Sequence, residues 1–262
     1  MYGTIFKHSI TNTLAYRFGV FVRILTLSLM LTVMYFVFKA YYAGIAPGNA
    51  PVDFRTLISY IALAQFVGIV HWSMLIVQTG ERVRNGKIAM ELLRPYDYQT
   101  YQLAVNAGNS VSTLLTTGVP VFILYVLIFR AGSAFTPATA ALFLLSMALS
   151  FLVRFYWNYI VSSLTFYVEN AWGLSVASAY FVYLFAGQLI PYPLIPEPFH
   201  TILAHSPFAA MLYTPVGIGT GIISGSGILS AFLMQAAWIA ILALAGRFLF
   251  SRASRAITLH GG

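Results

Sequence analysis

Apolar residues along this chain fall into long runs that short polar or proline- and glycine-rich stretches separate. Six runs are long enough to cross a bilayer as helices, which needs about 20 mostly apolar residues each. They cover residues 18–42, 57–79, 103–129, 138–161, 171–190 and 228–250. Backbone groups in lipid must pair within their own segment, so these runs predict transmembrane helices. The alternation of apolar and polar residues that is typical of a membrane β-barrel is absent.

The stretch before the first run has an amphipathic pattern. Its apolar face carries Tyr2, Ile5, Phe6, Ile10, Thr13 and Leu14, and Lys7, His8, Thr11 and Asn12 lie off that face. This pattern predicts a short helix at residues 1–17 that lies flat in the membrane interface. The alternative is an irregular extension of the first span. The stretch lacks the compact apolar core and cleavage site of a signal peptide, so we expect it to remain on the mature protein.

A second unusual segment lies at residues 188–227, between the fifth and sixth runs. It holds six of the 11 prolines and a single charged residue, Glu197. The segment is too apolar for a solvated loop and too broken for a straight span. Irregular backbone at membrane depth is tolerated where protein buries it. We therefore predict a pair of re-entrant half-helices on the outer side, and the alternative is a proline-rich loop over the outer membrane face.

Composition agrees with a membrane protein and leaves no room for a separate soluble domain. Of 262 residues, 60% are hydrophobic and 8% are charged, and the mean hydropathy is +0.82. A soluble domain would carry about 25% charged residues. The prediction is one all-α integral membrane domain over residues 1–262, with six transmembrane helices. Because the chain has no cysteine, disulfides, thiol nucleophiles and thiolate metal sites are excluded.

Basic residues lie at the ends of the runs and predict the orientation. One side collects eleven of them and the other side three, which puts both termini in the cytoplasm of a multi-pass cell-membrane protein. The orientation in the membrane explains the net charge of +8, and no nucleic-acid partner is expected. The larger group is Lys7, Arg17, Arg23, Arg82, Arg84, Lys87, Arg94, Arg154, Arg247, Arg252 and Arg255, and the smaller one is Lys39, Arg55 and Arg130.

Catalytic chemistry has little support in the sequence. The chain has only six carboxylates, and no catalytic pair of them is evident. The five histidines lack metal-ligand spacing, so no metal site is expected. Arg154 and Glu169 lie near the inner ends of the fourth and fifth runs, where an unpaired charge is costly. We interpret them as a structural ion pair or as snorkelling side chains rather than as a proton relay.

Aromatic residues are abundant, and most of them suit lipid contact or the interfacial belts. Some aromatic positions in the second and fifth runs are candidates for the lining of a path for an amphiphilic or aromatic substrate. Periodicity does not separate lining from lipid contact in helices that are apolar all round. The candidates are Phe66, His71, Trp72, Tyr180, Tyr183 and Phe185.

The densest run of charge is GERVRNGKIAMELLRP, at residues 80–95. Gly80, Gly86 and Lys87 nearly form the phosphate-binding pattern G-x-x-x-x-G-K-[ST]. Five residues rather than four separate the two glycines, and Ile88 stands where that pattern needs a hydroxyl for magnesium. The chain is therefore not expected to bind ATP or magnesium itself.

The same run predicts a short surface helix. Asn85 is a favourable N-cap, and the helix must end near Arg94 because Pro95 disfavours helical geometry in the preceding residue. Ile88, Leu92 and Leu93 would form one apolar side. Arg82, Arg84, Lys87 and Arg94 would supply charge for contacts with a partner.

Three motifs together resemble the type-2 ABC exporter permeases, in their small six-span branch. They are G-x-I-x-x-x-L-L-R-P at residues 86–95, TFYVENAWGL at 165–174, and GQLIPYPLIPEPF…SPFAAMLYTP…G at 187–217. The likeness covers nearly the whole chain. It implies a non-enzymatic permease that works with two copies of a cytoplasmic ABC ATPase, which bind ATP and Mg, and with a second permease, identical or paralogous.

The resemblance also implies roles for particular segments. Residues 80–100 would be the cytoplasmic coupling loop, and residues 188–227 the outer re-entrant segment. The expected ATPase-coupling residues are Glu81, Arg82, Arg84, Gly86, Lys87, Ile88, Glu91, Leu92, Leu93, Arg94 and Pro95, and Arg154 and Glu169 belong to the inner turn.

Two other functions compete with an exporter. A membrane-embedded lipid-modifying enzyme is disfavoured because no polar cluster is evident. An ion-coupled transporter or channel usually has charges or broken helices at mid-membrane, whereas the breaks visible in this sequence lie to one side. Co-purification of an ATPase would favour the exporter, and transport without ATP hydrolysis would favour the ion-coupled transporter.

Overall fold

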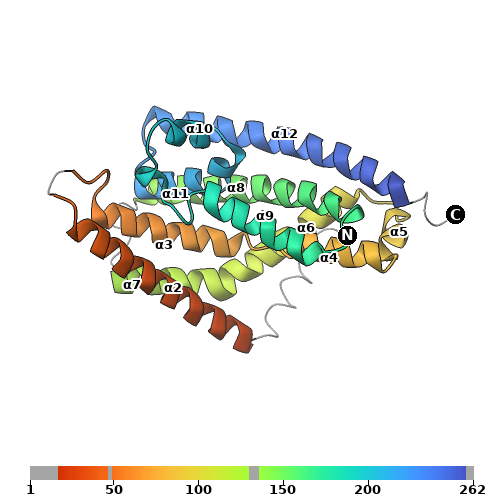
Figure 1. Ribbon diagram of the computed structural model, residues 1–262, viewed down its shortest axis with the longest axis horizontal. Helices are drawn as coiled ribbons and strands as arrows, with labels where there is room; N and C mark the ends of the chain where they lie inside the picture. The colour runs from red at the N-terminus through yellow and green to blue at the C-terminus, as the bar shows by residue number, and fades with distance from the viewer. Residues whose placement is uncertain (1–16, 47–48, 130–135, 258–262) are drawn as a thin grey trace.

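The computed structural model describes residues 17–46, 49–129 and 136–257, and this part of the chain folds as helices without a strand (Figure 1). The predicted interfacial helix lies outside the described residues, apart from Arg17, which begins α2. The α-helices are α2 (Arg17–Ala43), α3 (Phe54–Val70), α4 (Leu75–Arg84), α5 (Lys87–Leu92), α6 (Tyr98–Thr113), α7 (Val119–Phe129), α8 (Pro137–Ser163), α9 (Ala171–Phe185), α10 (Phe199–Ala204), α11 (Thr214–Thr220) and α12 (Ser226–Ile257).

Five of the six predicted spans are long and apolar enough in the described residues to cross a membrane. Two of these five are composite. The second span joins α3 to α4 through residues 71–74, which are not helical, and the third joins α6 to α7 through a π-helical turn, Leu114–Gly118. The fifth run forms α9, which has 15 residues and is shorter than a full span.

The early end of α9 has a cause in tertiary packing. Gly187 has φ +84°, and a Cβ added there would lie 2.3 Å from the Tyr192 ring. Only glycine accepts both the left-handed backbone and this close approach. The Tyr192 hydroxyl donates to the carbonyl of Phe185 at 2.8 Å, which satisfies the last turn of α9. The chain therefore turns under Tyr192 at the point where the apolar run alone predicted more helix.

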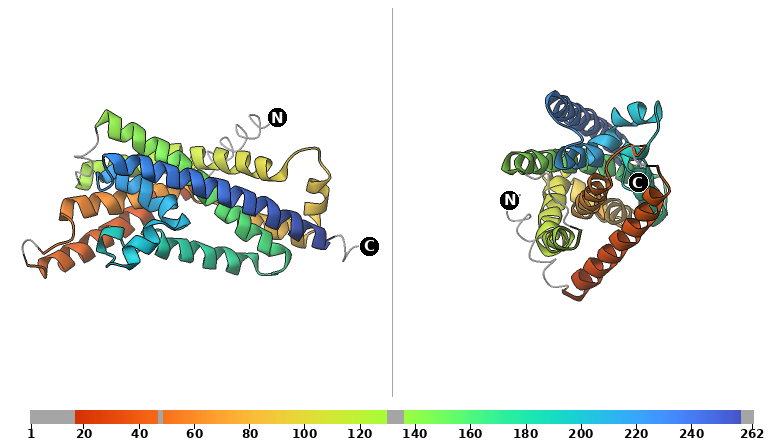
Figure 2. Two further views of the ribbon diagram at one scale, coloured as in Figure 1. Left: turned by 90° about the horizontal axis from the view of Figure 1, so that it is seen from above. Right: turned by 90° about the vertical axis from the view of Figure 1, so that its left-hand side faces the viewer.

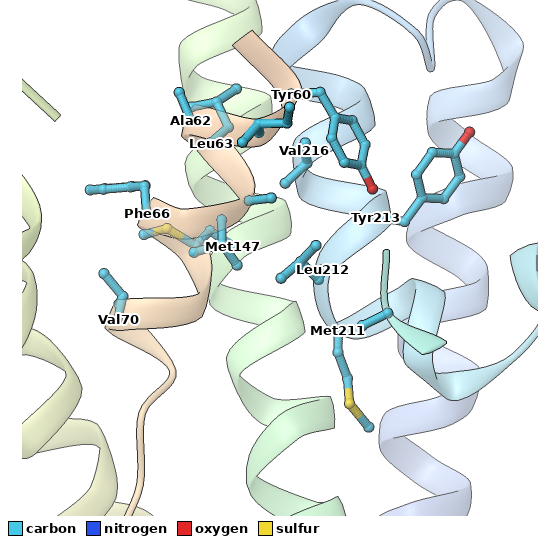
Figure 3. Close-up of a cluster of buried hydrophobic side chains, with 14 of the residues drawn as sticks. Tyr60, Ala62, Leu63, Phe66, Val70, Met147, Met211, Leu212, Tyr213 and Val216 are labelled. Carbon is cyan, nitrogen blue, oxygen red and sulfur yellow. The ribbon is translucent and has the colours of Figure 1, made fainter. Parts of the chain in front are cut away.

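Helix α3 is the centre of the bundle. It is buried along most of its length and packs against α2, α7 and α11. Figure 3 shows Tyr60 of α3 beside Val216 of α11, whereas Phe66 and Val70 point to the other side of α3. By contrast, few of the large apolar side chains of α2 and α12 are buried and many are exposed, as expected for helices that face lipid or another protein.

The proline-rich segment forms two short helical pieces with different surroundings. Helix α10 has no buried residue. A π-helical turn, Ala209–Tyr213, leads directly into α11, and residues 209–220 are all buried, in contact with α3 and α8. The ring of Tyr213 stacks on Tyr192 with centroids 4.3 Å apart. This half of the segment is thus part of the bundle core rather than a loop over its surface.

A second, smaller core holds one end of the bundle together. Leu75, Ile88, Tyr98, Phe155, Tyr159 and Phe250 form it, so it joins α4, α5, α6, α8 and α12. The rings of Tyr98 and Phe250 stack with centroids 4.9 Å apart. We call this end, with α5, residues 164–170 and the C-terminal part of α12, the α5 end. Figures 1 and 2 show it opposite the end that carries the link between α2 and α3.

Candidate functional site

Helix α5 lies across the α5 end of the bundle, and a glycine sets its direction. Helix α4 ends at Asn85, and Gly86 then takes φ +69°, a left-handed conformation that glycine adopts without steric cost. Helix α5 covers Lys87–Leu92 and ends before Pro95, as the sequence predicted. The prediction was wrong about Asn85, which closes α4 and does not cap α5.

The apolar residues of α5 do not form one side, contrary to the sequence prediction. Ile88 is fully buried in the small core, whereas Leu92 is 38% exposed and Leu93 is 85% exposed. Met90, which the sequence reading did not single out, is 67% exposed. A helix this short has room for one inward residue per turn, so Ile88 anchors α5 and the other three remain open.

The charged residues of this segment also divide into two groups. Arg82 pairs with Glu91, with 3.4 Å between Nε and Oε1, and it donates to the Tyr98 hydroxyl at 3.4 Å. Arg82 and Glu91 thus connect α4, α5 and α6. Among the predicted coupling residues, the charged side chains that remain exposed are those of Glu81, Arg84, Lys87 and Arg94.

Asp97 begins α6 beside α5. Its Oδ1 accepts from the backbone N–H of Thr100 at 2.8 Å and from the Thr100 hydroxyl at 2.6 Å, and Arg247 of α12 lies 3.8 Å away. Partial burial opposes ionisation of this carboxyl, but the Thr100 hydrogen bonds and the Arg247 charge outweigh it and lower the pKa of Asp97. The pairing connects the α5 end of α12 to the start of α6.

The inner turn, at residues 164–170, opens a cleft next to α5. The cleft has a volume of about 790 Å³ and lies between α4 and the turn. Helix α4 approaches the start of α9 closely at Gly80, where an added Cβ would lie 2.2 Å from Cβ of Ala171. The lining residues are Gly80, Val83, Arg84, Thr165, Phe166, Tyr167, Val168, Glu169 and Asn170.

Of the two interpretations of Arg154 and Glu169, an ion pair or snorkelling side chains, the ion pair is not formed. Glu169 is exposed in the inner turn, and the ion pairs among the described residues do not include either residue. Arg154 lies within α8 with its Nε buried and without a hydrogen-bond partner in the described part of the chain. Arg154 lies more than two helical turns before the end of α8, whereas Glu169 lies in the turn after it. The two side chains are therefore at different levels of the bundle.

The predicted path residues do not gather around one channel in this chain. Phe66 and His71 are buried, Trp72 and Tyr180 are 55% and 69% exposed, and Tyr183 and Phe185 are partly buried. Phe66 is a core residue, with its ring centroid 5.3 Å from that of Phe122.

Sequence reading missed a row of polar residues on α6. Tyr98, Gln102 and Asn106 are spaced by four, so they share one helix face, and all three are buried. The hydroxyl of Ser73, in the non-helical stretch 71–74, donates to Asn106 Oδ1. The i, i+4 spacing was visible in the sequence as YxxxQxxxN and is the signal that would have found this row.

Comparison with known families places this geometry in context. Residues 29–261 match the sequence model of a family described as ABC-2 family transporter protein. The match covers nearly the whole chain, including α5, the inner turn and the proline-rich segment. A search of curated proteins gives no match.

Proposed function

The chain belongs to the ABC-2 family of transporter proteins, and from this premise we propose that it is the transmembrane subunit of an ATP-driven exporter whose α5 end docks on a separate ATPase. It is a multi-pass membrane protein of an ABC transporter permease family. In the proposal, ATP and Mg bind to two copies of the ATPase, and a second permease, identical or paralogous, completes the transporter. The cargo is an amphiphilic molecule that moves outward.

The arrangement of α5 is the observation that carries the proposal. Ile88 anchors α5 in a core shared by α4, α6, α8 and α12, while Met90, Leu92 and Leu93 face outward. Exposed apolar side chains next to exposed charged ones at the end of a bundle are typical of a protein contact. A displacement of α5 by a partner would be transmitted to four long elements through one packed core.

Charge supports a cytoplasmic position for this end. Arg84, Lys87, Arg94 and Arg252 are exposed there, and basic residues at span ends favour the cytoplasmic side. An ATPase that uses cytoplasmic ATP would reach α5 and the neighbouring cleft of the inner turn. Both termini would then be cytoplasmic, and residues 188–227 would be the outer re-entrant segment.

The exposed apolar faces of α2, α9 and α12 suit the two remaining partners, lipid and a second permease. Helix α9 is too short to cross the bilayer by itself, so the proposal is that protein contacts complete this part of the membrane domain.

The test compares two apolar residues of the same short helix. In Leu93→Asp the charge lies on an exposed surface, so we expect normal expression and folding. ATPase association should weaken by about tenfold or more, since an unpaired charge in a packed interface costs on the order of 2 kcal/mol or above. Association would be measured by titrating the purified ATPase against the permease in nanodiscs, together with transport into inverted vesicles.

Two controls make the result specific. Ile88→Asp places the same charge in the small core and should lower the amount of folded protein. Ile202→Asp changes a residue that is 65% exposed on α10, away from the α5 end, and should leave ATPase association unchanged. Normal association and normal transport by Leu93→Asp would contradict the docking role of α5.

One observation favours a second candidate, an ion-coupled transporter. The expectation that breaks lie to one side was wrong, because α3 and α4 are interrupted at residues 71–74 in the middle of a span. Broken helices at this depth are typical of ion-coupled carriers. Transport by permease-only proteoliposomes under an ion gradient, without ATPase or ATP, would establish this candidate.

A further inference from the structure

The interruption between α3 and α4 lies beside a cavity inside the predicted membrane region. The cavity has a volume of about 220 Å³ and a mostly apolar lining from α3, α6 and α8. Leu144 of α8, 53% exposed, lies at its rim, so the cavity opens to the outer surface of the bundle. His71, only 6% exposed, also lines it, and its Nε2 has no hydrogen-bond partner in the described chain. A buried ring nitrogen without a hydrogen-bond partner is costly unless a ligand or water pairs with it.

Two rows of side chains lead from this cavity toward the small core. On α8 the row continues from Met147 through Phe151 to Arg154, at helical spacing. On α6 it runs from Ser110 through Asn106 to Gln102.

Ring contacts bracket the level at which the two rows meet. His71 lies 6.1 Å from Phe151, and Tyr98 lies 6.5 Å from Tyr159, between ring centroids. Arg154 lies between Phe151 and Tyr159 on α8, and Gln102 lies about one turn after Tyr98 on α6. Gln102 is fully buried, and both polar atoms of its side chain lack partners in the described residues.

Arg154 forms no ion pair with an Asp or Glu side chain, and a count of these side chains establishes this. The sequence contains six, all within the described residues, and none of them forms an ion pair with Arg154. Glu91 pairs with Arg82 and Asp97 with Arg247, while Glu197 pairs with His200. Of the remaining three, Asp53 caps α3, and Glu81 and Glu169 are exposed.

A cation inside a membrane span is a functional site by default and needs a partner. Arg154 and Gln102 offer N–H donors, and His71 lines the apolar cavity that opens sideways. We propose that Arg154 and Gln102 bind the anionic end of an amphiphile whose apolar part enters the cavity beside His71, and that such anionic amphiphiles are the cargo. The statement about cargo rests on the proposed function, whereas the binding site does not.

The size and lining of the cavity narrow the class of ligand. Drug-sized sites measure roughly 300–1,000 Å³, so this cavity suits a single ring or a medium-length acyl chain. A guanidinium with free N–H groups matches a carboxylate or phosphate. A cationic amphiphile would meet Arg154 with a like charge and would be rejected.

The experiment uses purified permease in nanodiscs without the ATPase. A medium-chain carboxylate that carries a diazirine is photo-crosslinked, and its trimethylammonium counterpart of equal chain length is compared. We expect the carboxylate to label peptides containing residues 107–114 and 144–151. Arg154→Gln should lower this labelling by about tenfold or more, the factor that corresponds to loss of one charge-assisted hydrogen bond. Arg252→Gln, an exposed arginine on α12, is the matched control and should label normally.

Gln102→Leu is a second variant in case Arg154→Gln does not fold, and it should also lower labelling by the carboxylate. The site would be overturned if folded Arg154→Gln were labelled by the carboxylate as strongly as the original protein. It would also be overturned if the cationic probe labelled the original protein as strongly as the carboxylate does. In complexes with the ATPase, the carboxylate should stimulate ATP hydrolysis in the original protein but not in Arg154→Gln. If Leu93→Asp is still labelled by the carboxylate but its ATP hydrolysis is no longer stimulated, the failure lies in docking of the ATPase. If the original complex is labelled but its ATP hydrolysis is not stimulated, the assignment of the cargo is overturned.

Discussion

Helix α8 carries two buried polar sites that differ in how completely their hydrogen bonds are made. Near its start, Ser146 meets Gln235 of α12, which is fully buried. The Gln235 Nε2 donates to the carbonyls of Ser146 and Ala210 at 3.1 and 3.0 Å, and its Oε1 accepts from the Ser146 hydroxyl at 3.1 Å. Two turns further along, Arg154 has a buried Nε with no partner in the described residues.

The difference shows how a structural polar side chain can be told from one that is available to a ligand. Gln235 uses the hydrogen-bonding atoms of its side chain to join three elements, so it has none left for a ligand. Its bond to Ala210 holds the π-helical turn before α11 against α8 and α12. An unsatisfied group such as Arg154 keeps its donors available, at a cost in stability. Substitutions at these two sites should therefore change stability in opposite directions.

The largest expected effect is at Gln235. Gln235→Ala removes three hydrogen bonds and leaves the carbonyl of Ala210 unpaired, so we expect a loss of about 3 kcal/mol in the free energy of unfolding. Thermal unfolding of the purified permease in nanodiscs would measure it. A change below about 0.5 kcal/mol would show that the bonds to Ser146 and Ala210 do not hold this region together.

A smaller effect of opposite sign is expected at Arg154. Arg154→Met removes a partly buried charge that forms no ion pair with a carboxylate side chain, and it keeps most of the apolar length, so stability should rise by about 1–2 kcal/mol. The same unfolding assay, without added amphiphile, measures the change. A clear decrease in stability would mean that another protein or the membrane supplies a counter-ion, and the contrast with Gln235 would disappear.

The smallest effect is expected at Ser146. Ser146→Ala removes only the hydroxyl bond to Gln235, because the Ser146 carbonyl remains, and should cost about 1 kcal/mol. Combined with Gln235→Ala it should add little, since both changes remove the same bond. A double-mutant cycle measures this coupling, and fully additive effects would show that the two side chains act separately.

Several features of the fold and of the candidate site were predictable because they depend on local rules. Apolar length predicted the helices of five spans, and Pro95 predicted the end of α5. The density of prolines predicted that residues 188–227 would not form a straight helix. The family resemblance, carried by three motifs, agrees with the match over residues 29–261.

Other features of the fold could not be predicted from the local sequence. Residues 57–79 read as one apolar run, yet the chain leaves the helix at 71–74 without a proline or glycine there. The Ser73 hydroxyl bonds to Asn106 and accepts from the backbone N–H of Leu75, so a side chain on another helix helps to satisfy the interruption. Backbone freed from a helix inside a membrane is tolerated only with such partners.

The sequence by itself determined the solvent, the helical class and the positions where the chain is forced to turn, because apolar length, charge and proline act through the chain's nearest neighbours. Tertiary structure alone decided that Ile88 is buried and Leu93 is exposed, that α9 stops at Gly187, and that Arg154 has no carboxylate partner. Burial and pairing depend on which distant helices meet at a point. That meeting is set by the packing of the whole bundle, which no local pattern records.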